Sequence, residues 1–306
     1  MIKEKIAQAS EILREEHIDL WLTFVRESEV TGDPALEVIL GANCTWHSAF
    51  MIPAKGKAVA IVGSLDEARI RETGGYEVVG YTKSIKDSLL EHINRFAPRT
   101  IAVNFSEYDC MSDGLSHGMY LSLMRYLDGT PYTSRLVSSE SIQSKLRGRK
   151  SPEEIRRIRA AVELAETIFT KVSGIMKPGL SEKDVAAFIL DEVKRYGVET
   201  AWEREQCPAV FTGPESAGAH AGPTDRKIER GHVLNIDFGV RVEGYVSDLQ
   251  RTWYFLRAGE KKAPAEVMKP FETIRDAIAL AAEKIRPGME GLAVDTIART
   301  YITDRG

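Results

Sequence analysis

The stretch from His220 to Thr252 reads HAGPTDRKIERGHVLNIDFGVRVEGYVSDLQRT. Apolar and polar residues alternate from Val233 to Phe238, glycines interrupt the run, and aromatic and β-branched residues resume at Tyr245. This pattern predicts two antiparallel strands joined by a short turn. Such a hairpin brings together two aspartates, Asp237 and Asp248, that are eleven positions apart in the sequence.

Two carboxylates at neighbouring strand positions repel each other unless they are protonated or share a cation. Hard divalent ions such as Mn²⁺, Mg²⁺ and Co²⁺ suit oxygen ligands, so the pair Asp237 and Asp248 predicts a metal site with one or two ions. Each aspartate also has a purely structural interpretation. Asp237 fits a turn residue before Phe238 and Gly239, and Asp248 fits an exposed ion pair with Arg251.

The aspartates occur together with a His-Ala-Gly segment that begins at His220, seventeen positions before Asp237. The combination resembles the pita-bread metallopeptidases, which include methionine aminopeptidases, Xaa-Pro aminopeptidases, prolidases and the metal-free creatinases. The resemblance implies that Asp237 binds one ion with both carboxylate oxygens and that Asp248 bridges two ions. It also implies that His220 is catalytic, since the matching histidine lies beside the substrate and helps to stabilise the transition state.

The same resemblance implies a cofactor of two divalent metal ions, Mn²⁺ or Co²⁺, with Zn²⁺ or Fe²⁺ as alternatives. Thr252, four positions after Asp248, is expected to support the ligand carboxylate from outside the first shell of ligands. The family uses three further ligands, a histidine and two glutamates, from strands nearer the C-terminus. The sequence ends at Gly306 without such segments. We therefore expect the functional protein to continue for about another 50 residues.

A pair of helices is expected twice in the second half of the chain. One helical run, Pro152 to Met176, leads into Lys-Pro-Gly, and another, Pro264 to Ile285, leads into Arg-Pro-Gly. Each is followed by a further amphipathic segment, so we predict an internal repeat. The first copy continues to the hairpin of Asp237 and Asp248, whereas the second ends before a matching hairpin.

The first half of the chain alternates helix and strand, which is typical of an α/β domain with a buried sheet. The expected helices are 2–16, 65–72 and 85–96, and the expected strands are 19–24, 48–52, 58–62, 76–79 and 100–104. The next long helix opens with Ser151 as its N-cap and Pro152 at its first position. We predict an α/β N-terminal domain at residues 1–146, of the creatinase and prolidase N-terminal type by resemblance. An α+β pita-bread catalytic domain, incomplete at its C-terminus, is expected at residues 147–306.

Composition fits two ordinary hydrophobic cores, because the 306 residues are 43% hydrophobic and 28% charged. The net charge of −4, with both signs interspersed, offers no basic surface for nucleic acid. We expect neither a membrane-spanning segment nor a signal peptide, since no apolar run is long enough and the N-terminal helix is charged. Three widely spaced cysteines fit reduced thiols, so a cytoplasmic protein is expected.

The resemblance implies metal-dependent hydrolysis of peptides, by a homodimeric Xaa-Pro aminopeptidase or Xaa-Pro dipeptidase acting on a peptide or dipeptide. The segment SPEEIRRIRAAVELAE, which begins at Ser151, resembles the start of the catalytic domain in two-domain Xaa-Pro peptidases and creatinases. Methionine aminopeptidases lack the N-terminal domain. Two alternatives stay open. One is a metal-free, creatinase-like amidinohydrolase, which the presence of both Asp237 and Asp248 disfavours, and the other is a non-catalytic binding protein on the same fold.

Overall fold

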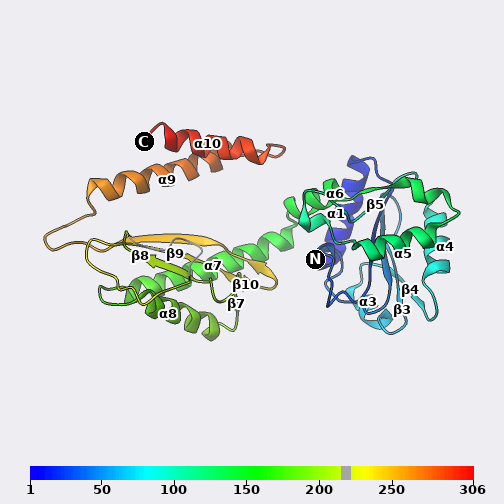
Figure 1. Ribbon diagram of the computed structural model, residues 1–306, viewed down its shortest axis with the longest axis horizontal. Helices are drawn as coiled ribbons and strands as arrows, with labels where there is room; N and C mark the ends of the chain where they lie inside the picture. Colours follow the sequence, from blue (N-terminus) through cyan, green and yellow to red (C-terminus); the bar gives the residue numbers. More distant parts are fainter. Residues whose placement is uncertain (215–221) are drawn as a thin grey trace. The chain divides into compact units, whose positions relative to one another are not determined.

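A computed structural model describes residues 1–214 and 222–306 of the chain. The chain folds into two compact units, Met1–Ile155 and Arg156–Gly306 (Figure 1). The contacts thus divide the chain just after the first turn of a long helix, α7 (Pro152–Ile175). The domain boundary between residues 146 and 147 stays a prediction.

The first unit is built on a six-stranded sheet in the order β4-β3-β2-β1-β5-β6. Strands β1, β2 and β3 pair antiparallel, and the other neighbours pair parallel. Every residue of β1, β2 and β3 is buried, as expected for central strands covered on both faces. The six strands are β1 (Leu20–Val25), β2 (Ser48–Pro53), β3 (Val59–Gly63), β4 (Glu77–Tyr81), β5 (Ile101–Val103) and β6 (Leu136–Ser138).

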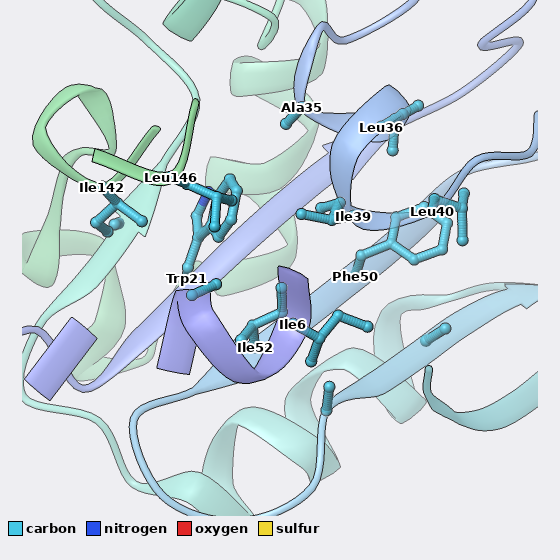
Figure 2. Close-up of a cluster of buried hydrophobic side chains, with 14 of the residues drawn as sticks. Ile6, Trp21, Ala35, Leu36, Ile39, Leu40, Phe50, Ile52, Ile142 and Leu146 are labelled. Atoms are coloured by element: carbon cyan, nitrogen blue, oxygen red, sulfur yellow. The ribbon is translucent and has the colours of Figure 1, made fainter. Parts of the chain in front are cut away.

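Helices cover both faces of this sheet and give the unit two hydrophobic cores. On one face, Ile6 of α1 and Leu146 of α6 pack with Trp21 and Phe50 of the strands, as Figure 2 shows. On the other face, α4 and α5 cover residues such as Leu22. The helices of this unit are α1 (Ile2–Glu15), α2 (Ala35–Ile39), α3 (Glu67–Thr73), α4 (Lys86–Phe96), α5 (His117–Leu127) and α6 (Glu140–Gly148), with short 3₁₀ turns at Cys110–Ser112 and Pro131–Arg135.

A buried ion pair joins α1 to the first turn of α7. The Lys5 side chain is 0% exposed, and its Nζ donates to Glu154 Oε2 at 2.9 Å and to the carbonyl oxygens of Leu146 at 2.6 Å and Arg149 at 3.2 Å. Glu154 Oε2 also accepts from the backbone N–H of Ser151 at 2.7 Å, and Glu154 N–H donates to Ser151 Oγ. This reciprocal pair confirms Ser151 as the cap of α7.

The second unit packs two helices on antiparallel strands. Helices α7 and α8 (Glu182–Arg195) supply apolar residues to one core with the strands. The strands form two three-stranded sheets, in the orders β12-β9-β8 and β11-β10-β7. They are β7 (Glu199–Thr200), β8 (Ala209–Thr212), β9 (Val233–Phe238), β10 (Val240–Val242), β11 (Tyr245–Val246) and β12 (Leu249–Tyr254).

The repeated helix pair is present. After α7 the chain passes through Gly179, with φ at +96°, into α8. In the same way α9 (Ala265–Lys284) passes through Gly288, with φ at +87°, into α10 (Gly291–Thr303). Each glycine follows a proline as the third residue of a turn, a position that requires a positive φ. Among the helices that the structure describes, none is both long enough and apolar enough to cross a lipid bilayer.

Candidate metal centre

The hairpin of β9 and β12 has one apolar face and one polar face. Leu234, Ile236 and Phe238 of β9 are fully buried against the helices. Asn235 and Asp237 alternate with them, so they point to the opposite face of the strand. Strand β9 pairs antiparallel with β12, which confirms this part of the predicted hairpin, whereas β10 and β11 belong to the other sheet.

The register of the hairpin sets the neighbours of Asp237. Antiparallel pairing places Gln250 opposite Asp237 and Thr252 opposite Asn235. Asp248 precedes β12 by one residue and therefore shares the parity of Gln250 and Thr252. Five polar side chains from two strands are thereby directed to one face of the sheet.

Gly239 explains why the two aspartates come together. A Cβ on this residue would lie 1.8 Å from the carbonyl oxygen of Ser247, so only glycine allows the two strands to approach this closely. Beyond this point, Val240 N–H donates to Ser247 Oγ at 3.0 Å, and the chain continues as β10 and β11 in the other sheet. Ser247 immediately precedes Asp248, so this contact fixes the backbone position of Asp248 at the start of β12.

The two carboxylates interact unfavourably when both are charged. Removal from water raises the pKa of the Asp248 carboxyl, and the neighbouring Asp237 carboxylate raises this pKa further. A divalent cation would replace this repulsion with attraction, because two carboxylates balance its charge. The pair therefore has the electrostatics of a cation site.

Two acceptor oxygens on this face have no donor among residues 1–214 and 222–306. Asp237 Oδ2 accepts from Gln250 Nε2 at 3.2 Å, but Asp237 Oδ1 is buried without a hydrogen-bond partner. Asn235 Nδ2 donates to Thr252 Oγ1 at 2.9 Å, and Asn235 Oδ1 is likewise buried without a partner. Buried polar atoms are nearly always paired, so each orphaned oxygen needs an explanation. Oxygen acceptors without donors fit a hard divalent ion.

The described ranges 1–214 and 222–306 contain no group of three or more His, Cys, Asp or Glu side chains arranged to hold a metal ion. His220 lies outside these ranges, so its catalytic role stays a prediction. The structure brings Asp237 and Asp248 together, and their role as metal ligands also stays a prediction. These two aspartates are thus the part of the proposed ligand set that the structure describes.

The structure shows one contact of Thr252. Its hydroxyl accepts from Asn235 Nδ2, because Thr252 lies opposite Asn235 in the ladder, and its support of the ligand carboxylate stays a prediction. Gln250 is the side chain that supports Asp237. Neither Asn235 nor Gln250 is predicted from the sequence, although both have the strand parity of the aspartates. That parity was the signal available to find them.

A buried glutamate joins the residues that come before and after the segment that carries His220. Glu182, the first residue of α8, is 3% exposed. Its Oε1 accepts from Thr212 N–H at 2.8 Å, and its Oε2 accepts from the N–H and hydroxyl of Thr224 at 2.9 and 2.6 Å. One carboxylate thus joins Thr212 to Thr224, which precede and follow residues 215–221 in the sequence.

Comparison with known proteins places the second unit in a sequence family. Residues 156–306 match the model of Metallopeptidase family M24. The uncharacterized peptidase YqhT of Bacillus subtilis is 25% identical over 277 residues, which cover 90% of this chain and 69% of that protein. An uncharacterized peptidase of Staphylococcus aureus is 32% identical over 162 residues, which cover 53% of this chain and 44% of that protein. The chain therefore spans only part of the length of these relatives.

A solved structure shares the fold of the whole chain. An Xaa-Pro dipeptidase from Bacillus anthracis superposes with a TM-score of 0.71 at 21% identity, over 100% of this chain and 78% of that one. This likeness, with the family match, confirms the predicted fold class, an α/β N-terminal domain followed by an α+β pita-bread domain.

Proposed function

Because this chain belongs, through residues 156–306, to metallopeptidase family M24, we propose that it hydrolyses peptides with divalent cations held at Asp237 and Asp248. The observation that carries the proposal is the paired carboxylates beside buried oxygens without donors. Buried acceptor oxygens without donors are poorly satisfied until a cation reaches them. The cations would polarise the scissile carbonyl and activate water for attack.

The residues around the aspartates have distinct tasks in this proposal. Asp237 and Asp248 hold the cations, and Gln250 fixes the orientation of Asp237 through its 3.2 Å hydrogen bond. His220 donates a hydrogen bond to the substrate carbonyl as negative charge develops there. Thr252 acts one step further away, through Asn235.

The proposed substrates are peptides with proline after the scissile bond, cleaved either as dipeptides or at the N-terminus of longer peptides. Support comes from the N-terminal α/β unit, since an Xaa-Pro dipeptidase shares the fold over the full length of this chain. We further propose a cytoplasmic homodimer that uses Mn²⁺ or Co²⁺, with Zn²⁺ or Fe²⁺ as alternatives.

Two other functions are disfavoured by particular observations. A metal-free, creatinase-like amidinohydrolase has no need of two neighbouring carboxylates, where burial and then the charge of Asp237 raise the pKa of Asp248. A binding protein on the same fold would gain nothing from a buried, unpartnered oxygen on Asp237. Both alternatives predict that loss of Asp248 is silent in a cation-binding assay.

The test compares Asp248→Asn with Arg251→Gln. Asp248→Asn removes one negative charge where cations approach, so it should lose at least one ion and orders of magnitude in hydrolysis of an Xaa-Pro dipeptide while the fold survives. Arg251 pairs with Glu166, away from the aspartates, and should matter little to either readout. Metal analysis, circular dichroism and peptide hydrolysis give the result. Full metal content and full hydrolysis in the Asp248 variant would refute the proposal.

A further inference from the structure

We infer that the side-chain oxygen of Asn235 is a third, uncharged oxygen ligand for the cation at Asp237 and Asp248. This inference rests on the proposed function, because it deepens the description of the same site. It adds a residue that neither the spacing of the aspartates nor their charge identifies. Its basis is the position of Asn235 in the sheet, together with the hydrogen bond of its Nδ2 and the lack of a described donor for its Oδ1.

Asn235 is fixed in position by the centre of a sheet. It lies in β9, the middle strand of the order β12-β9-β8, opposite Thr252 on one side and Phe211 on the other. Asp237 follows two positions later in the same strand, so both side chains leave the same face. An extended strand rises about 3.3 Å per residue, which separates their Cα atoms by about 7 Å. Two side chains at that spacing can converge on one ion.

The amide of Asn235 is oriented by its nitrogen. Nδ2 donates to Thr252 Oγ1 at 2.9 Å, and this bond fixes the rotation of the amide group. Oδ1 is buried, and no donor in the part of the chain that the structure describes reaches it. Thr252 therefore acts as the anchor of the Asn235 amide.

A cation is the partner that best suits the unpaired Oδ1 of Asn235. Asp237 Oδ1, on the same face, is also buried and also lacks a donor. Two acceptors without donors on one face of the sheet share one need, and a divalent cation would meet it at both oxygens. The neutral side chain of asparagine limits the repulsion in the metal-free chain. It supplies an oxygen without adding a third negative charge to Asp237 and Asp248, which already repel each other.

Binding of Mn²⁺ to the chain tests the inference without any assay of hydrolysis. The electron paramagnetic resonance signal of free Mn²⁺ gives the dissociation constant for each variant. Asn235→Leu should weaken binding roughly tenfold, and Thr252→Val, which removes the anchor, should weaken it by a smaller factor. Asn235→Asp should bind Mn²⁺ more tightly, since it keeps the oxygen and adds a charge. Arg251→Gln is the matched control and should leave binding unchanged.

The outcomes separate this inference from the proposed function. If Asp237→Asn abolishes binding and Asn235→Leu leaves the dissociation constant within twofold of the parent, Asn235 is no ligand and the proposed function survives. Weaker binding by Asn235→Asp would likewise overturn the inference. If the parent chain binds no Mn²⁺ that depends on Asp237, both the inference and the metal site fall.

Discussion

Glu182 offers the sharpest test of how the fold supports the site. Replacing it with glutamine keeps the size of the side chain and removes the charge. The glutamine oxygen can still accept from Thr212 N–H, but its NH₂ group then faces the backbone N–H of Thr224. Two donors that face each other cannot bond, so the hold on one end of the segment that carries His220 should be lost.

The magnitude follows from the three hydrogen bonds to this buried carboxylate. Hydrogen bonds to charged groups contribute about 1.5–3 kcal/mol each. The glutamine keeps the bond to Thr212, and the hydroxyl of Thr224 can turn to accept from its NH₂. The charge-assisted bond from Thr224 N–H is therefore the main loss. Glu182→Gln should lower the free energy of unfolding by about 2–3 kcal/mol.

Urea unfolding measures this loss, and Lys183→Ala supplies the control. Lys183 follows Glu182 and pairs with Asp225 at 2.7 Å, but both members of that ion pair are well exposed. The control should therefore cost at most about 1 kcal/mol. Peptide hydrolysis should fall in Glu182→Gln and stay unchanged in the control. Equal unfolding free energies for the two variants would refute the role given to Glu182.

Three further predictions concern single positions. His220→Ala should leave Mn²⁺ affinity intact and lower turnover by roughly a hundredfold, and loss of the ion would instead identify His220 as a ligand. Gly239→Ala should cost about 3 kcal/mol in thermal or urea unfolding, because its methyl group meets a carbonyl. Gly174→Ala, in open space on α7, should stabilise by about 0.5–1 kcal/mol, and equal effects would contradict the clash. Glu154→Gln leaves the Lys5 charge buried and should cost about 3–5 kcal/mol, part of which the double variant Lys5→Met with Glu154→Leu should recover.

Much of the fold is predictable from local pattern. The strand expected at residues 19–24 is β1 at Leu20–Val25, and the helix expected at 85–96 is α4 at Lys86–Phe96. Each has the apolar periodicity of its kind of secondary structure, and its apolar residues are buried in the core. Strand β6 is not predicted, because three residues are too few to establish a period.

The site is less predictable, because it depends on register. The sequence predicts one continuous hairpin from Val233 to Leu256, whereas the strands pass into a second sheet beyond Gly239. That transition depends on a contact between Gly239 and Ser247, which no local pattern records. The roles of Asn235 and Gln250 follow only once pairing partners are known. Charge identified the aspartates, and pairing identified their neutral neighbours.

The ion pair between Lys5 and Glu154 has a consequence for how such two-domain chains can be shuffled in evolution. A recombination event that joins a foreign N-terminal domain at residue 147 would bring a new partner to Glu154, or none. Inheritance of the N-terminal domain should therefore include the opening turn of α7, so that Lys5 and Glu154 pass on together. We expect the tolerated crossover point inside the helix, after Ile155, because this keeps the Ser151 cap and the Lys5–Glu154 pair in one piece.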